Sequence, residues 1–256
     1  MELTLESLTP VVSVLRSARR ILVITGAGLS ADSGLPTYRG VGGLYEDNPN
    51  TEDGMPVEKA LSGPMFRQRP ELTWRHILQI ENACRSAMPN DGHRIVAKWE
   101  QRFDKVCVLT QNIDGFHRKA GSTHVIDIHG DTRDLLCTEC NWQDTVEDYS
   151  GLPELPRCPK CDAVIRPNVV LFEEMLDVAK LADLAEQQSL GFDVIFSIGT
   201  SALFPYIAQP VWAAQQTATV TVEINPQATE LSSLVTYAIR SKAAAALTAL
   251  DEALEK

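Results

Sequence analysis

Short runs of apolar, mostly β-branched residues recur along the chain, and segments with a helical pattern separate most of them. These runs cover residues 21–25, 106–110, 125–129, 194–198 and 219–224. Unbroken apolar runs of this length are typical of strands that are buried on both faces. Helices between such strands favour parallel pairing, so the pattern predicts an α/β fold with a doubly wound parallel sheet.

Helices are predicted at both ends of the chain and in its middle. Thr9 followed by Pro10 fits an N-cap and a first helical position, which predicts a helix from there to about Arg20. The pattern also favours helices near 71–84 and 91–103, and the alanine-rich segment 241–256 predicts a surface helix.

Two stretches interrupt the alternation of strands and helices. Residues 36–64 are rich in Pro, Gly, Asn and Asp, and residues 131–167 hold four of the six cysteines. Each stretch leaves from a loop next to a predicted strand, so we expect the two to build a smaller satellite domain. The length of 256 residues, near the upper limit for one hydrophobic core, agrees with this division.

Charge and composition exclude several classes of function. The chain has 23 Lys and Arg against 34 Asp and Glu, and the net charge of −11 argues against a nucleic-acid partner. No apolar run approaches the roughly 20 residues of a membrane span, and the start MELTLESLTP lacks the positive charge of a signal peptide. We therefore expect a cytoplasmic protein whose cysteines are thiols or metal ligands.

A glycine-rich turn follows the first predicted strand. Gly26, Ala27, Gly28, Ser30 and Ala31 fit the dinucleotide-binding pattern G-x-G-x-x-G/A, in which backbone groups approach a pyrophosphate. A dehydrogenase would next show a second strand that ends in an acidic residue about 20 residues further on. The sequence there has no strand pattern, so NAD is compatible with the turn, whereas ordinary hydride transfer is a less expected use of it.

Four cysteines have the spacing of a zinc site. Cys137 and Cys140 form one C-x-x-C pair, Cys158 and Cys161 form a second, and 17 residues separate the pairs. Because sulfur fills all four positions, no site is open for water, and we expect one structural zinc ion.

Polar residues follow several of the predicted strands. In an open parallel sheet, ligands bind beyond the carboxyl ends of the strands, so clusters that converge there indicate a pocket. His129 is distinct because it ends a predicted strand and precedes a glycine. The polar residues after the other strands are Gln111, Asn112, Asp114, Gly199, Thr200, Ser201 and Asn225.

Taken together, these residues resemble the sirtuins, a family of NAD-dependent protein-lysine deacylases, and the resemblance is to bacterial members. The motifs that carry it occur in the family's order and are GAGLSADSGLPTYRG at 26–40, TQNIDGFHRKAG at 110–121, IHG at 128–130, the paired cysteines and IGTS at 198–201. The resemblance implies a Rossmann-like doubly wound parallel sheet together with a smaller zinc-ribbon and helical domain. It places the NAD-binding domain at 1–36, 96–130 and 168–256, and the small domain at 37–95 and 131–167.

The resemblance also implies roles for individual residues. His129 would be the general base, and Val170, Phe172 and Glu173 would contact the acyl-lysine substrate. Asn112 would act in catalysis as well as in binding, because with Ile113 and Asp114 it would hold the carboxamide of nicotinamide. The residues implied in NAD binding are Gly26, Ala27, Gly28, Ser30, Ala31, Tyr38, Arg39, Gln111, Asn112, Ile113, Asp114, Gly199, Thr200, Ser201 and Asn225.

Overall the chain is most similar to the class that includes desuccinylases, but it departs from that class in the acyl pocket. Those members carry a Tyr and an Arg three residues apart, where this chain has Ile77 and Ile80. Without the arginine, a dicarboxylic acyl chain would bury an unpaired carboxylate, so a neutral acyl chain is favoured. A shifted alignment onto Trp74 and Arg75 would restore acidic specificity. Glu173 is a second departure, since the family has glycine there.

Three functions remain open from the sequence. Deacetylation with consumption of NAD is favoured, giving nicotinamide, O-acyl-ADP-ribose and free lysine. The same pocket would also serve mono-ADP-ribosyl transfer or NAD hydrolysis, and a non-catalytic NAD-binding scaffold is the third possibility. The expected partners are acyl-lysine proteins or peptides, with no nucleic acid and no membrane. The oligomeric state is left open, and a monomer is compatible with the sequence.

Overall fold

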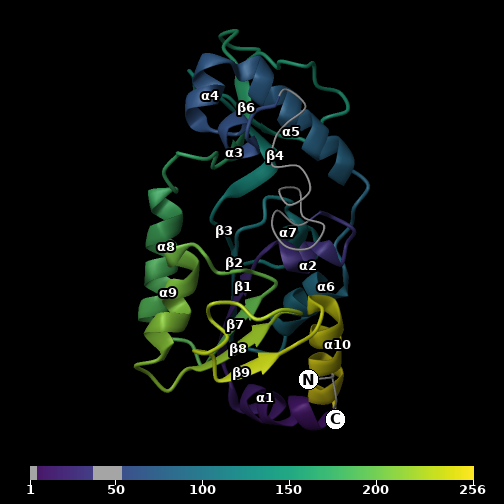
Figure 1. Ribbon diagram of the computed structural model, residues 1–256, viewed down its shortest axis with the longest axis vertical. Coiled ribbons are helices and arrows are strands. Elements are labelled where there is room, and N and C mark those ends of the chain that lie inside the picture. The colour runs from purple at the N-terminus through teal and green to yellow at the C-terminus, as the bar shows by residue number, and fades with distance from the viewer. Residues whose placement is uncertain (1–4, 37–53) are drawn as a thin grey trace.

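The computed structural model describes residues 5–36 and 54–256, and in this part of the chain a parallel six-stranded sheet forms the centre of the larger unit (Figure 1). The strand order is β3-β2-β1-β7-β8-β9. The order reverses between β1 and β7, as in doubly wound nucleotide-binding folds, which confirms the predicted fold class. The strands are β1 (Arg20–Thr25), β2 (Lys105–Thr110), β3 (Val125–Asp127), β7 (Val194–Ile198), β8 (Val220–Ile224) and β9 (Tyr237–Ile239).

Helices cover both faces of this sheet because its strands alternate their side chains between two cores. Ile21 and Val23 of β1 face a core that includes apolar residues of α1, α6 and α10. Leu22 and Ile24 face the opposite core, which includes residues of α8 and α9. Figure 1 shows α8 and α9 on the side of the sheet opposite to α10. The helices are α1 (Leu5–Ser17), α2 (Ala27–Ala31), α6 (Asp91–Trp99), α7 (Phe116–Lys119), α8 (Val178–Ser189), α9 (Pro205–Ala214) and α10 (Ala243–Leu254).

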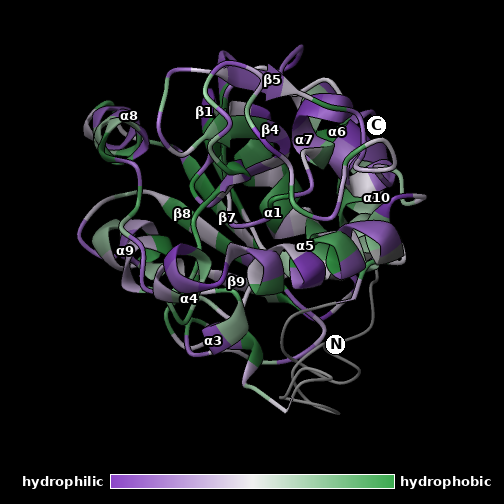
Figure 2. Ribbon diagram, turned by 90° about the horizontal axis from the view of Figure 1, so that it is seen from above, coloured by the Kyte–Doolittle hydropathy of each residue, from purple (hydrophilic) through white to green (hydrophobic). Residues whose placement is uncertain are grey.

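Among the described residues, the small unit combines an antiparallel sheet with three helices. Its sheet has the order β5-β4-β6, and Trp74 of α5 lies fully buried against it, with Nε1 donating to the carbonyl oxygen of Ile165 at 2.7 Å. Figure 2 shows α5 with both hydrophobic and hydrophilic segments, as expected for a helix with one buried face. The elements are α3 (Val57–Ala60), α4 (Gly63–Gln68), α5 (Pro70–Cys84), β4 (Gly130–Cys137), β5 (Gln143–Thr145) and β6 (Ile165–Val169). The domain boundaries given above stay predictions.

The first helix begins earlier than the sequence pattern predicts. It starts at Leu5, so Pro10 lies inside it rather than at its first position. The reason is the apolar stripe: Leu8 is as deeply buried as Val11 and Leu15, and a helix that began at Pro10 would leave Leu8 outside the stripe. Pro10 removes one hydrogen bond near the start of the helix, a loss that the packing of the stripe offsets.

Further boundaries also differ from the sequence-based expectation, since the first helix ends at Ser17 and Arg20 already belongs to β1. The strand predicted at 125–129 ends at Asp127, and Ile128 and His129 form a turn that leads into β4. Gly130 at the end of this turn has a φ of +91°, and a Cβ there would lie 1.9 Å from the carbonyl oxygen of Asn168. The helix predicted near 91–103 ends at Trp99.

A buried carboxylate holds the loop after β8 in place. Glu223 is 1% exposed and accepts hydrogen bonds from Thr229, from Ser232 (Oγ to Oε2, 2.6 Å) and from the guanidinium of Arg240, with which it forms an ion pair. The loop begins at Asn225, one of the predicted site residues. The network therefore connects the stability of this edge of the fold to the position of Asn225.

Removal of this carboxylate is predicted to destabilise the protein. Glu223→Ala leaves Arg240 partly buried without its partner, and we expect the free energy of unfolding to fall by about 3 kcal/mol. Urea denaturation followed by circular dichroism measures the change. The matched control is Glu252→Ala on the exposed side of α10, for which we expect a change within about 0.5 kcal/mol. Equal effects of the two substitutions would contradict the role given to Glu223.

Candidate functional site

The carboxyl ends of three adjacent strands meet at the centre of the sheet. In the parallel register, Thr25 at the end of β1 lies opposite Thr110 of β2 and Ile198 of β7. The segments that follow these strands are therefore neighbours, although they are far apart in the sequence. Hydrogen bonds connect them, from Gln111 Nε2 to Thr200 Oγ1 at 2.8 Å and from Asn112 Nδ2 to the carbonyl oxygen of Gly26 at 3.0 Å.

The glycine turn touches the loop after β7 through backbone atoms. The N–H of Gly28 donates to the carbonyl oxygen of Gly199 at 2.8 Å, and a Cβ on Gly28 would lie 2.7 Å from Gly199 Cα. Gly199 has a φ of +58°, which glycine adopts without strain. A side chain at either glycine would separate the two loops. Gly28 and Gly199 therefore leave a surface of bare backbone there, which we call the glycine cradle. Such a cradle fits the close approach of a dinucleotide diphosphate.

Asn112 is the centre of a buried polar cluster. Its Nδ2 donates to Ser30 Oγ at 3.0 Å, and Ser30 in turn donates to Asp114 Oδ2 at 2.6 Å. The N–H of Phe116 donates to the other carboxyl oxygen of Asp114 at 2.9 Å. Burial nevertheless raises the pKa of Asp114 above its ordinary value. The cluster brings together three of the residues predicted for NAD binding, and Ile113 lies between two of them in the chain.

His129 has a partner for each ring nitrogen. Nδ1 lies 2.9 Å from the backbone oxygen of Gln111, and Nε2 lies 2.6 Å from the hydroxyl of Tyr206. Burial lowers the pKa of His129, while the carbonyl of Gln111 acts in the opposite direction. The lowered pKa favours the neutral imidazole, which stands at the same edge of the sheet as the Asn112 cluster.

Tyr206 and its neighbour Phe204 are site residues that the sequence reasoning missed. They follow the IGTS motif by a few residues, at the start of α9, and both aromatic rings contact His129. The position directly after a strand-end motif was an available signal. The contact itself joins residues 77 apart in the sequence, and no local pattern reveals it.

The segment after β6 runs between His129 and the small unit. The N–H of Val170 donates to the carbonyl oxygen of His129 at 2.8 Å, and the N–H of Phe172 donates to that of Leu61 at 3.0 Å. Glu173 is exposed and has a φ of +65°, in the left-handed region that favours glycine. Of the three predicted substrate residues, Val170 thus bonds the backbone of His129, and Phe172 and Glu173 follow Val170 by two and three residues.

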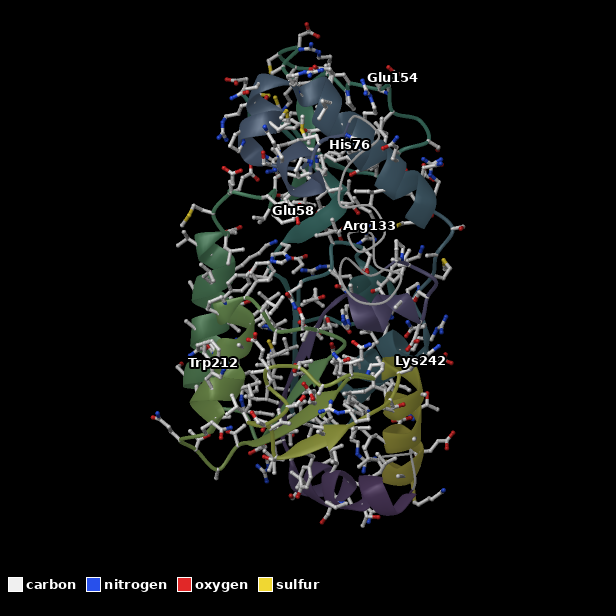
Figure 3. The ribbon with its side chains drawn as sticks, viewed as in Figure 1. Glu58, His76, Arg133, Glu154, Trp212 and Lys242 are labelled. Atoms are coloured by element: carbon white, nitrogen blue, oxygen red, sulfur yellow. The ribbon has the colours of Figure 1, made fainter. Side chains whose placement is uncertain are left out.

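The small unit also holds the loop after β2. Arg133 of β4, labelled in Figure 3 below the helices of the small unit, pairs with the buried Asp131 at 2.6 Å between Nη2 and Oδ2. A Cβ on Gly115 would lie 2.3 Å from that same guanidinium nitrogen. The N–H of Thr132 donates to the carbonyl oxygen of Ile113 at 2.9 Å. These contacts fix the backbone on both sides of Asp114.

The predicted acyl-pocket positions are apolar. Ile77 is buried and Ile80 is half-buried, and both belong to the hydrophobic cluster of the small unit that also contains Phe172. The indole N–H of Trp74 already donates to the carbonyl oxygen of Ile165, and Arg75 lies on the exposed side of α5. The arrangement does not favour the shifted alignment through Trp74 and Arg75.

The remaining predicted residues are distributed as follows. Asn225 Nδ2 donates to the carbonyl oxygen of Thr200 at 3.2 Å, so Asn225 joins the loop after β7. Ser201 is exposed beside it, and Ala27 and Ala31 are half-buried in α2. Tyr38 and Arg39 lie outside the described residues.

The four predicted cysteines converge at one point of the small unit. Their sulfur atoms all lie within 4.8 Å of one another, with Cys137 and Cys161 at 3.5 Å and Cys140 and Cys158 at 3.6 Å. A tetrahedral zinc ion with Zn–S bonds of about 2.3 Å separates its sulfur ligands by about 3.8 Å, so these distances fit. Backbone N–H groups of Cys140 and Lys160 point at Cys137 and Cys158 at 3.4 Å, which favours thiolate ligands.

The chain belongs to the Sir2 family, whose members are the sirtuins. The Sir2 family model matches residues 26–204, a stretch that begins at the glycine turn and ends just before α9. It contains the Asn112 cluster, His129 and all four cysteines. In the described part of the chain, no helix is long and apolar enough to cross a membrane.

Two curated proteins illustrate the similarity. "NAD-dependent protein deacylase 2" of Pseudomonas syringae pv. tomato is 49% identical over 235 residues, which cover 91% of this chain and 94% of that protein. "NAD-dependent protein deacylase 1" of Archaeoglobus fulgidus is 37% identical over 227 residues, which cover 88% and 89%.

Two solved structures of Sir2 proteins are also similar to this chain. A Sir2 homologue in complex with NAD has a TM-score of 0.85 at 33% identity, covering 96% of this chain and 93% of that one. A Sir2 structure with a deacetylated p53 peptide and 3′-O-acetyl ADP-ribose has a TM-score of 0.84 at 26% identity, covering 96% and 98%.

The cysteine cluster predicts that the purified protein contains zinc. The purified protein is expected to carry about one zinc ion per chain, and Cys140→Ser is expected to lose most of it and to melt at a lower temperature, since structural zinc contributes folding energy directly. Elemental analysis and a thermal melt measure the two effects. Cys84→Ser is the control, because Cys84 lies half-buried at the end of α5 outside the cluster. Unchanged zinc content in Cys140→Ser would refute the assignment.

Proposed function

We propose that this protein is an NAD-dependent protein-lysine deacylase, with deacetylation as the favoured reaction. It would consume NAD and release nicotinamide, O-acyl-ADP-ribose and the free lysine. The observation that carries the proposal is the neutral imidazole of His129, held with a lone pair on Nε2 at the sheet edge that also carries the glycine cradle and the Asn112 cluster. Family membership supports it.

The proposed roles follow from the groups that each residue presents. NAD supplies the ribose carbon that accepts the acyl oxygen, with nicotinamide as the leaving group. Asn112 and Asp114 offer an amide and a carboxyl group for the carboxamide of nicotinamide, in a buried cluster where such bonds are stronger than in water. His129 accepts a proton at Nε2 from a ribose hydroxyl. Orientation of the weak amide nucleophile provides the main rate enhancement.

Other residues would bind the rest of the dinucleotide. Gly28 and Ser30 would lie beside the diphosphate, and Gly199, Ser201 and Asn225 on the adenosine side. The family resemblance assigns Gln111 to the nicotinamide ribose, and its backbone oxygen lies beside Nδ1 of His129. The remaining assignments rest on the sequence motifs and comprise Gly26, Ala27, Ala31, Tyr38, Arg39 and Thr200.

Zinc would have a structural role. Its four thiolate ligands leave no position open for water or substrate. We also propose a cytoplasmic location, which is supported by free thiols at Cys84 and Cys107 among the described residues.

The acyl preference follows from the apolar α5. A succinyl chain next to Ile77 and Ile80 would lose the hydration of its carboxylate without gaining a cationic partner there, which costs several kcal/mol. A neutral chain pays no such penalty. The substrate is therefore proposed to be acetyl-lysine or a longer neutral acyl-lysine.

An acyl panel on one peptide tests this preference. We expect kcat/KM for the acetyl peptide to exceed that for the succinyl peptide by at least about 100-fold, the equivalent of roughly 3 kcal/mol. A butyryl peptide of similar chain length but no charge is the control, and it should retain most of the activity. Comparable turnover of succinyl and butyryl peptides would contradict the preference.

Two other functions compete with deacylation. ADP-ribosyl transfer and NAD hydrolysis use the same activated ribose carbon, and a non-catalytic scaffold would bind NAD without turnover. Incubation with NAD and an acetyl-lysine peptide separates them. Nicotinamide release that depends on the peptide supports deacylation, whereas release without peptide supports hydrolysis and labelled ADP-ribose on protein supports transfer.

Replacement of the proposed base is the direct test of mechanism. His129→Ala should lower the rate of deacylation by roughly 10²–10⁴-fold while NAD binding and the fold are retained, because general-base catalysis contributes an effect of this size. Product formation is measured by mass spectrometry of the peptide. His124→Ala is the control, since His124 precedes β3 at the opposite end of that strand. Near-full activity of His129→Ala would exclude His129 as the base.

A further inference from the structure

In the hydrogen bond between Tyr206 and His129, the chemistry fixes which group donates and which accepts. The Gln111 oxygen next to Nδ1 is a carbonyl, which only accepts, so Nδ1 carries the hydrogen of the neutral ring and Nε2 carries the lone pair. The hydroxyl of Tyr206, 2.6 Å from Nε2, must therefore donate. Burial raises the pKa of Tyr206 to about 12, so the phenol keeps its proton at neutral pH. The hydroxyl of Tyr206 thus occupies Nε2, the basic nitrogen of His129.

Aromatic packing holds the phenol in this position. The rings of Phe204 and Tyr206 are stacked, with centroids 5.5 Å apart and an interplanar angle of 16°. Both rings stand edge-on to His129, at 6.0 Å and angles of 85° and 82°. Ala202, with a φ of +54°, turns the chain before this pair. Because the stack depends on the ring and not on the hydroxyl, phenylalanine at position 206 is expected to preserve it.

Charged groups near His129 influence its pKa without a direct hydrogen bond to the ring. Lys180 of α8 lowers the pKa of His129 through its charge, and it is itself paired with Asp127 at 2.7 Å between Nζ and Oδ1. Asp127 also pairs with Arg118 at 3.1 Å. The Gln111 carbonyl contacts Nδ1, whereas Tyr206 from α9 contacts Nε2, the atom on which proton transfer depends.

We propose that Tyr206 is a positioning residue that occupies Nε2 of His129 in the free protein and releases it when the ribose hydroxyl of the substrate binds there. The inference rests on the proposed function, in which Nε2 accepts a proton from that hydroxyl. One lone pair accepts one strong hydrogen bond, so the phenol and the ribose hydroxyl compete for it. Tyr206 keeps the imidazole neutral and correctly turned before substrate arrives, and it opposes substrate binding by the strength of one hydrogen bond.

The test is Tyr206→Phe, read out first in the free protein. In a ¹⁵N NMR titration of the histidine side chains, Nδ1 should stay protonated in the variant, because the Gln111 carbonyl is unchanged. The pKa of His129 should rise by roughly 0.5, since the variant lacks a donor that stabilises the neutral ring. The wild-type phenol can turn to accept from the charged ring, which keeps this rise small.

The second readout is turnover as a function of pH. The base must be neutral, so a higher pKa moves the acid limb of the kcat/KM profile for NAD to higher pH. Above that limb, removal of the competitor should raise kcat/KM roughly three-fold, the equivalent of a weak hydrogen bond. Tyr237→Phe, which removes a tyrosine hydroxyl on β9, is the matched control and should leave the titration and the pH profile unchanged.

Two results would overturn the inference. One is a His129 titration in Tyr206→Phe that coincides with that of the wild type. The other is a kcat/KM that falls at every pH, which would show that turnover requires the phenol. Failure of the proposed function is a different result, because wild-type protein without peptide-dependent turnover would still give the NMR titration of His129.

Discussion

The parallel register of β1 between β2 and β7 is the constraint on which the site depends. It places Thr25, Thr110 and Ile198 side by side, so that three loops leave the sheet at one point. The loops then approach one another through backbone atoms, which is possible because Gly28 and Gly199 carry no side chain. A slip of one residue in either strand pair would turn the strand's side chains to the opposite core and separate these loops. Packing of the two hydrophobic cores therefore protects the site as well as the fold.

Several polar groups at this edge pair with one another. Ser30, Asn112 and Asp114 form one chain of hydrogen bonds, and His129 bonds Gln111 and Tyr206. Pairing satisfies groups that would otherwise be buried at a high cost in free energy. A ligand that binds at this site therefore replaces existing hydrogen bonds and does not only form new ones. Affinity then depends on the difference between the old and the new partner of each group.

Much of the fold and of the site could be predicted from the sequence because its signals are local. The apolar runs predicted five strands of the parallel sheet but not β9, the C-x-x-C pairs predicted the cysteine cluster, and the strand-end residues predicted a polar cluster at the sheet edge. The start of the first helix was predicted wrongly because the signal of Thr9 and Pro10 is local, whereas the burial of Leu8 is decided by tertiary packing. Tyr206 was missed for the same reason, since its partner lies 77 residues away.

The strand β4 joins two chemically unrelated centres. It begins at Gly130, directly after His129, and ends seven residues later at Cys137, a span of about 23 Å. The strand β6 pairs with both ends of β4, at Gly130 and Asp131 and again at Leu135–Cys137, so the far end of β4 supports its near end. Oxidation of the thiolates would release that support. The position of His129 would in this way depend on a cysteine cluster that takes no part in the proposed chemistry.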